Sequence, residues 1–413
     1  MANPESPSAD RRDLPFTAAE AQRVLVGIDP GLVTSFLQRL VRVASVNPPG
    51  DTAEAIAVCE EPLRAAGFRL RHVEHAPGQP SLIAEFGPDD GPTLLFNAHV
   101  DVVPTGELAA WTHPPFAAEI AQNRVYGRGA GDDKASVTAQ VMAGAALARS
   151  GVPLRGRLVV NEVADEESGG GGARATIAGL GYQPDWVIVG EQTLNRVAVG
   201  EKGAASSEVV VSGRAAHGAL PWEGANAIEG AARVIVALGE ELGPQLASRT
   251  HPYFHPSTAS VNLISGGVKQ NVVADQCTFF VDRRLVPGET PEEAVAELAA
   301  VAERAVAGMP GVSVEVRAHW AVTPTLADES GESVLAMRAA NGYLGMSTDL
   351  TGFSMGTDGR FFAQAGCPTI IYGPGDPRLA HVPDEWVGLD EVLDATRAYA
   401  LTALALLRRR DNG

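Results

Sequence analysis

The sequence predicts an α/β protein whose main layer is interrupted by an inserted α+β domain. Short apolar runs bounded by glycine or proline alternate with helical patterns in residues 17–203 and again in residues 319–413. Between these stretches, residues 204–318 follow a β-α-β-β-α-β order, which is typical of ferredoxin-like domains. A chain of 413 residues also exceeds the usual size of a single hydrophobic core, so two domains are expected.

Helices and strands of the main layer follow from the spacing of apolar residues. Helical spacing predicts a helix from Asp29 to Val46, a second from about Thr52 to Ala66, a third from Ala135 to Ala148 and a last one from Asp390 to about Leu407. Short apolar runs that end in turn residues predict the strands. These strands are 70–73, 81–86, 93–97, 158–160, 185–190 and 368–372.

The inserted stretch has its own alternation of elements. The expected strands are 207–211, 258–264, 278–285 and 312–318, and the expected helices are 226–242 and 291–307.

Composition and charge exclude several classes of partner. Hydrophobic residues make up 45% of the chain and charged residues 20%, which is typical of a globular protein. The 32 Lys and Arg against 50 Asp and Glu give a formal net charge of -18, and this negative field repels nucleic-acid backbones and anionic lipid. The apolar runs are also shorter than the ~18 residues of a membrane span. We therefore expect no nucleic-acid partner and no membrane association.

The cysteines and the N-terminal stretch indicate a reducing compartment. Cys59, Cys277 and Cys367 lie far apart without a CxxC pair, so neither a disulfide framework nor a thiolate metal site is expected. Residues 1–16 are rich in proline, serine and charge and lack the apolar region of a signal peptide, so they are predicted to be a disordered tail. The expected location is the cytoplasm.

Acidic residues and a histidine recur where predicted strands end. His99 follows the third strand, and Asp101 could accept a hydrogen bond from one ring nitrogen while the other binds a metal. Glu166 and Glu167 lie between an apolar run and four glycines, and neighbouring residues at a strand end point in different directions. One could bind a metal while the other handles a proton, although paired acids before glycines are more often a solvated loop. Glu191 ends another buried strand, at the edge where α/β sheets bind ligands.

The segment Gly127-Arg128-Gly129-Ala130-Gly131-Asp132-Asp133-Lys134 has the glycine spacing of a nucleotide-binding loop. It lacks Gly-Lys-Ser/Thr, and Asp132 occupies the sixth position of a GxGxxG frame, so phosphate binding fits poorly. Asp132 could cap the following helix or bridge two cations.

Five residues together form a ligand set of nitrogen and oxygen atoms without thiolate: His99, Asp132, Glu167, Glu191 and His381. Such a set suits zinc, with cobalt or manganese as substitutes. If Asp132 bridges, each of two ions has one histidine, one terminal carboxylate and the shared carboxylate. Two ions ~3.5–4 Å apart would polarise a carbonyl group and lower the pKa of a shared water, whose proton Glu166 would accept.

The motifs resemble those of the di-zinc aminoacylase, carboxypeptidase G, acetylornithine deacetylase and succinyl-diaminopimelate desuccinylase metallohydrolase family. The resemblance covers nearly everything after the N-terminal tail. It rests on five motifs in the family's order, namely Ser45-Val46-Asn47-Pro48-Pro49-Gly50, His99-Val100-Asp101, Tyr126 to Lys134, Asp165-Glu166-Glu167 and His381-Val382-Pro383-Asp384-Glu385.

This resemblance implies a mixed-sheet α/β/α catalytic domain with an inserted ferredoxin-like lid that mediates homodimerisation. It implies that His99 and His381 each bind one metal ion, that Asp132 bridges, and that Glu167 and Glu191 complete the sites. Glu166 would be the general base, and Asp101 would orient His99.

The same resemblance implies roles for residues outside the metal sites. His217 would stabilise the oxyanion from the partner subunit, and Asn271 and Arg284 would hold a substrate carboxylate. Arg284 is preferred over Arg283 for this role because it keeps the family's pattern Asp-x-Arg. The alternative for both arginines is that they lie on a solvated face at a strand end and bind no substrate. Gly356, Thr357 and Gly373 are further candidates for substrate binding.

The expected activity is metal-dependent hydrolysis of a linear amide in an N-acyl amino acid or small peptide that carries a carboxylate. Deacylase, dipeptidase and carboxypeptidase remain open, and Glu191 resembles the desuccinylase and deacetylase side of the family. The alternatives are an unusual carbon-nitrogen bond such as an arylamine, a binding protein with a vestigial metal site, and a nucleotide-dependent transferase suggested only by the glycines.

Overall fold

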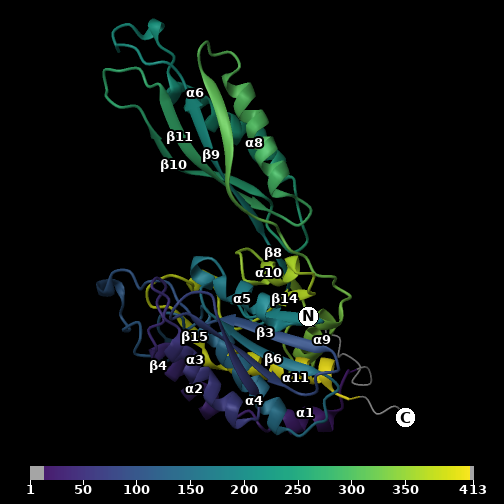
Figure 1. Ribbon diagram of the computed structural model, residues 1–413. Coiled ribbons are helices and arrows are strands. Elements are labelled where there is room, and N and C mark those ends of the chain that lie inside the picture. Colours follow the sequence, from purple (N-terminus) through teal and green to yellow (C-terminus); the bar gives the residue numbers. More distant parts are fainter. Residues whose placement is uncertain (1–13, 410–413) are drawn as a thin grey trace, which may run out of the picture. The chain divides into compact units, whose positions relative to one another are not determined.

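The computed structural model describes residues 14–409, which divide into two compact units (Figure 1). The first unit contains the chain up to Val199, Ala327–Thr351 and the chain from Thr357 onward. The second contains Gly200–Leu326 and Gly352–Gly356, whereas the sequence placed the insertion at 204–318. Residues 1–13 of the predicted tail lie outside the described residues. Phe16, also assigned to that tail, is instead buried and packs edge to face on Tyr343.

An eight-stranded mixed sheet forms the centre of the first unit. Strands β6, β3, β7 and β14 are neighbours and run parallel, while β1, β2 and β8 pair antiparallel. The predicted mixed-sheet α/β fold class is thus confirmed. The order is β1 (Arg69–Glu74), β2 (Pro80–Phe86), β6 (Arg157–Val163), β3 (Thr93–His99), β7 (Trp186–Val189), β14 (Thr369–Ile371), β8 (Val197–Glu201) and β13 (Leu350–Phe353).

Helices cover both faces of this sheet (Figure 1). On one face, α4 (Lys134–Arg149) packs against α11 (Leu389–Leu407), and every residue of α4 from Lys134 to Leu147 is buried. A helix buried on all sides lacks a strong amphipathic pattern. The other helices on this face are α1 (Ala18–Leu25), α2 (Pro30–Arg42), α3 (Ala53–Ala65) and α9 (Glu332–Leu344), and α5 (Gly171–Leu180) and α10 (Gly359–Gln364) cover the opposite face.

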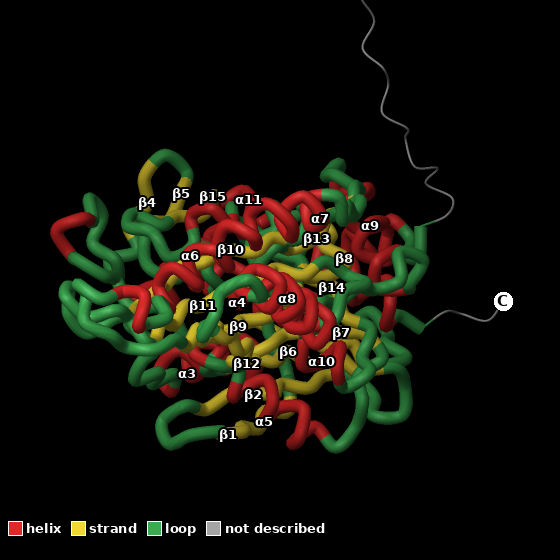
Figure 2. Tube along the Cα trace, turned by 90° about the horizontal axis from the view of Figure 1, so that it is seen from above, coloured by secondary structure: helices red, strands yellow, loops and turns green. Residues whose placement is uncertain are grey.

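A small antiparallel sheet of β15 (Trp386–Gly388), β5 (Arg124–Tyr126) and β4 (Glu119–Ala121) also belongs to the first unit (Figure 2). Its strands have three residues each, too few for a periodic signal, and the sequence did not predict them. Strand β5 leads into the Asp132 segment, and β15 follows the loop that carries His381. Their pairing therefore brings these two distant segments together.

The second unit has a four-stranded antiparallel sheet, and its two longer helices, α6 and α8, complete a β-α-β-β-α-β order in which the short helix α7 follows α6. The sheet order β10-β11-β9-β12 is the arrangement of ferredoxin-like domains. One face of β9 and β11 is buried against α6 and α8, and buried residues alternate with half-buried ones along β11. The elements are β9 (Gly203–Ser212), α6 (Ala227–Ala237), α7 (Gly243–Ala247), β10 (Thr258–Gly266), β11 (Gln276–Leu285), α8 (Pro291–Val306) and β12 (Ser313–Val322).

Among the described residues, no single helix has the length and apolar composition needed to cross a membrane. Helices α1 and α2 meet that test only when taken together, across a bend of 51°.

Candidate metal centre

Three strands of the large sheet deliver candidate ligands to the same edge. Strand β3 ends at His99, which is in register with Val163 at the end of β6. A short turn, Glu166–Ser168, follows β6, and Glu191 follows β7. Because β3 runs parallel to both neighbours, all three strand exits lie at one edge, which is where α/β sheets bind ligands.

The carboxylate of Asp132 lies between two histidines. Its Oδ1 is 3.2 Å from Nε2 of His99, and its Oδ2 is 3.1 Å from Nε2 of His381. Oε2 of Glu167 is 3.2 Å from the same nitrogen of His381. His99, Asp132 and Glu167 each offer a ligand atom within 4.8 Å of the others. Two oxygens of one carboxylate that face two different imidazoles have the arrangement that a bridging ligand requires.

The alternative in which Asp132 caps the following helix is wrong. Helix α4 begins at Lys134, its N-cap residue is Asp133, and the Asp133 side chain makes no capping hydrogen bond. The Asp132 side chain is free to face the histidines because the helix starts one residue later than that alternative requires.

Asp101 supports the site differently from the prediction. Nδ1 of His99 donates to the main-chain carbonyl of Asp101 at 2.9 Å, while the nearest carboxylate oxygen of Asp101 is 3.8 Å away. The carboxylate instead accepts from the backbone N–H groups of Glu166 (3.2 Å) and Glu167 (3.3 Å) and from Nδ2 of Asn47 (2.8 Å). The backbone of Asp101 thus orients His99 and leaves Nε2 available, and its side chain fixes the Glu166–Glu167 turn.

Replacing Asp101 with asparagine is expected to lower kcat about 10- to 100-fold, the usual cost of disturbing a group that orients a ligand. The asparagine amide would place an NH2 group where one carboxylate oxygen now accepts, either from Glu166 or from Glu167 and Asn47, but the main-chain carbonyl that holds His99 remains. Metal binding through His99 should therefore change less than kcat does. Steady-state kinetics with metal analysis checks this, and a loss of metal with unchanged kcat would contradict it.

Burial and crowding shift the pKa values of these groups. Burial would lower the pKa of His99, but its hydrogen bond to Asp132 and the charge of Glu166 raise it well above its usual value. Hydrogen bonds that His381 donates to the carboxylates of Asp132 and Glu167 raise its pKa to about 10. Burial opposes the shift of Asp132, yet hydrogen bonds to both histidines hold its pKa well below its usual range.

Burial and neighbouring acids raise the pKa values of two further carboxylates near the site. Burial raises the pKa of Glu191 well above its usual value, and the charges of Asp133 and Asp132 raise it further. Burial also raises the pKa of Glu166, assisted by Asp358 and Glu167 against the opposing charge of His99. Crowded acids around two imidazoles are stabilised by bound cations, so the donor set fits divalent metal ions.

Candidate substrate-binding residues lie in both units. Thr357 and Gly373 belong to the first unit, where Oγ1 of Thr357 accepts from the Gly359 N–H at 2.9 Å. A Cβ atom at Gly373 would lie 2.5 Å from the carbonyl oxygen of Glu191, so only glycine fits there. The N–H of Gly373 donates to Oγ1 of Thr193 at 3.1 Å.

The other candidates, His217, Asn271, Arg284 and Gly356, belong to the second unit. The segments of His217 and Asn271 are adjacent, because the N–H of Gly218 donates to the carbonyl of Asn271 at 2.8 Å. Both side chains are exposed.

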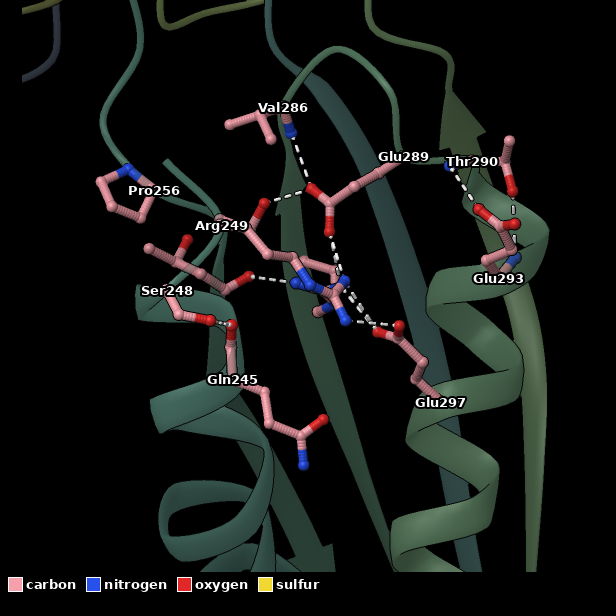
Figure 3. Close-up of polar contacts among 12 residues, drawn as sticks. Gln245, Ser248, Arg249, Pro256, Val286, Glu289, Thr290, Glu293 and Glu297 are labelled. Atoms are coloured by element: carbon pink, nitrogen blue, oxygen red, sulfur yellow. Dashed lines mark hydrogen bonds and ion pairs between the residues drawn. The ribbon is translucent and has the colours of Figure 1, made fainter. Parts of the chain in front are cut away.

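The two neighbouring arginines of β11 have different environments. Arg283 is 1% exposed and pairs with Glu289 (3.4 Å) and Glu297 (3.2 Å). The same two carboxylates also bind Arg249 (Figure 3). The Arg284 side chain is 42% exposed and pairs with Asp282 at 2.8 Å. Arg283 therefore stabilises the second unit, and Arg284 is the arginine that an incoming anion can reach.

Residues 95–405 match the family model described as Peptidase family M20/M25/M40. The chain belongs to this family. Its resemblance to the metallohydrolases is thereby confirmed, and the chain is a metal-dependent amide hydrolase that uses divalent metal ions.

Relatives of this M20/M25/M40 member span nearly its whole length. A succinyl-diaminopimelate desuccinylase of Paracoccus denitrificans (strain Pd 1222) is 30% identical over 389 residues, which are 90% of this chain and 96% of that protein. An N-formyl-4-amino-5-aminomethyl-2-methylpyrimidine deformylase of Bacillus subtilis (strain 168) is 28% identical over 362 residues, 81% and 85% of the two chains.

Solved structures share the fold at lower identity. Aminopeptidase PepT from Bacillus cereus ATCC 10987 superposes with a TM-score of 0.76 at 20% identity, covering 92% of this chain and 99% of that one. A dinuclear metal-binding peptidase of the M20 family from Bacillus subtilis gives a TM-score of 0.72 at 18% identity, covering 91% and 98%.

One M20/M25/M40 site residue had no role assigned from the sequence. Asn47 lies in the Ser45-to-Gly50 motif, and its Nδ2 donates both to Asp101 and to Oδ1 of Asp165 at 3.2 Å. Its place in a motif was a signal, but its partners are 54 and 118 residues away, and no local pattern reports such contacts.

Proposed function

We propose that this protein hydrolyses the linear amide bond of an N-acyl amino acid or small peptide with two divalent cations, zinc being the native metal. The observation that carries the proposal is the Asp132 carboxylate, which faces His99 with one oxygen and His381 with the other. Cobalt and manganese accept the same nitrogen and oxygen donors and are expected to substitute.

The contacts suggest how the ligands divide between the ions. Oε2 of Glu167 is 3.2 Å from Nε2 of His381, so these two residues would bind one cation. His99 and Glu191 would bind the other. Asp132 would be shared. Such cations polarise the substrate carbonyl and acidify a water molecule.

Glu166 is the residue that we assign as general base. Its backbone N–H is fixed by Asp101, so the start of its side chain is held in place next to Glu167. Burial raises its pKa, and a carboxylate with a raised pKa accepts a proton more readily than an ordinary one, which supports this assignment. The same group can later deliver the proton to the departing amine.

We assign substrate recognition to five residues. Arg284 would bind the substrate carboxylate, since a guanidinium group is suited to paired contacts with carboxylate oxygens, and Asn271 would assist it. Gly356, Thr357 and Gly373 would line the binding site. A desuccinylase and a deformylase are among the relatives, which supports an N-acyl substrate over a dipeptide.

We also propose a homodimer formed through the second unit, in which His217 stabilises the oxyanion in the partner's site. Its exposed position supports a contact beyond its own unit. The three cysteines are buried and unpaired, which supports the cytoplasm as the location.

Chelation and metal replacement test the function. Protein treated with a chelator is expected to lose hydrolysis of N-succinyl and N-acetyl amino acids, and about two equivalents of zinc per chain should restore it. Dipeptides and arylamides in the same panel distinguish peptidase activity and other carbon-nitrogen bonds. A protein that binds no zinc and turns over none of these substrates would instead be a binding protein with a vestigial site.

A further inference from the structure

The loop that carries His381 has an unfavourable backbone conformation. His381 and Asp384 have φ angles of 64° and 55°, in the left-handed region that side chains other than glycine rarely adopt. The His381 side chain is also 53% exposed, so packing around it is sparse. Residues in such conformations persist only where surrounding contacts hold them. The structure should therefore contain contacts that hold this loop.

Glu385 provides one such contact, to the segment of Asp132. Its carboxylate is fully buried, and Oε1 accepts from the N–H groups of Gly131 (2.9 Å) and Asp132 (3.0 Å). Oε2 accepts from Arg128 at 2.5 Å, and the carbonyl of Glu385 accepts from the Gly127 N–H at 2.8 Å. Glu385 thus ties the His381 loop to the backbone of the shared ligand Asp132.

Asp384 provides the second contact, to a different segment. Its Oδ1 accepts from the N–H groups of Thr112 (2.7 Å) and His113 (2.9 Å), about 270 residues away along the chain. That segment is itself fixed, because His113 stacks on Tyr126 with ring centroids 4.1 Å apart and its Nδ1 is 2.6 Å from Glu119. Tyr126 in turn pairs with Trp386, just beyond the loop.

We propose that Asp384 and Glu385 are positioning residues that clamp the His381 loop on two sides, and that Asp384 sets the affinity of the one cation that His381 binds. The inference rests on the proposed metal-dependent function. Glu385 also holds the Asp132 backbone, so its loss would disturb the binding of both ions and the stability of the fold. Among the described residues, the side-chain hydrogen bonds of Asp384 go to the Thr112–His113 segment, so its loss frees the His381 side of the site and leaves His99, Asp132 and Glu191 in place.

The test is stepwise zinc titration of metal-free protein by calorimetry, together with the melting temperature of each variant. Asp384→Ala is expected to lower the affinity for one of the two zinc ions about 10- to 100-fold and to leave the affinity for the other unchanged. Asp384→Asn keeps an acceptor oxygen and should restore most of the affinity. Excess zinc should recover the turnover of Asp384→Ala, because every ligand is still present.

Asp29→Ala is the matched control. Asp29 also accepts with one oxygen from two backbone N–H groups, those of Gly31 (2.7 Å) and Leu32 (3.0 Å), but it caps α2, and among the described residues its side-chain hydrogen bonds go to that helix. This variant should lose a similar amount of thermal stability and keep wild-type affinity for both ions. In a His381→Ala background, Asp384→Ala should have no further effect on zinc affinity, since the residue through which it acts is absent.

The outcomes separate this inference from the proposed function. Wild-type affinity of Asp384→Ala for both ions would overturn the inference and leave the metal-dependent function intact. The inference would also be overturned if Asp384→Ala weakened the binding of both ions equally, or if it weakened zinc binding further in the His381→Ala background. Either result would show that Asp384 has a general structural role. Failure of the wild-type protein to bind two ions would instead count against the proposed function.

Discussion

Glu166→Gln is expected to lower kcat by about 10²- to 10⁴-fold, the usual contribution of a positioned general base. Glutamine has nearly the same shape and keeps the backbone N–H that donates to Asp101, so the turn with Glu167 should be unchanged. The amide cannot accept a proton from water. Zinc content should therefore remain at the wild-type level while turnover falls, which metal analysis and steady-state kinetics on one sample can show.

The control for this variant is Glu107→Gln, which makes the same chemical change at an exposed position. It should keep the wild-type kcat. Near-normal turnover of Glu166→Gln would mean that another group accepts the proton. Loss of zinc together with turnover would mean that Glu166 is a ligand rather than the base.

Asp132→Ala is expected to abolish tight binding of both cations and to lower turnover by about 10³-fold or more, because bound cations supply several kcal/mol of transition-state stabilisation. Its two oxygens face different histidines, at 3.2 and 3.1 Å, so one substitution removes a ligand from both sites. His381→Ala removes a ligand from one site only. Zinc titration should thus show reduced affinity for both ions in Asp132→Ala and for one ion in His381→Ala.

The comparison of these two variants decides whether Asp132 bridges. If Asp132→Ala retained one tightly bound ion, the carboxylate would serve a single cation. The melting temperature of the metal-free proteins provides the control, since a folding defect would lower it without any zinc present.

The fold class and the convergence of the strand-end residues were predictable from the sequence. Parallel strands have buried, continuous apolar runs, and those of β3, β6 and β7 are visible as such. His99 is the last residue of β3, Glu166 and Glu167 come shortly after the end of β6, and Glu191 comes shortly after the end of β7. Once the strands were placed in a parallel sheet, geometry required their exits to share one edge.

What the sequence could not provide are contacts between distant segments. Strands β4, β5 and β15 have three residues each, and only their pairing makes them strands. The role of Asp101 differed from the prediction because the carbonyl that binds His99 belongs to the backbone, which every residue has. Burial of Phe16 depends on Tyr343, more than 300 residues away.

The first unit is built from stretches on both sides of the second, and this affects the order in which the site is assembled. During synthesis, His99, Asp132, Glu167 and Glu191 leave the ribosome before the second unit does, and His381 follows only after it. With His381 as a proposed ligand, a nascent chain would complete its cation sites, and begin to cleave amides, only after the second unit has been made. A translation product that stops before His381 would, by the same reasoning, be inert.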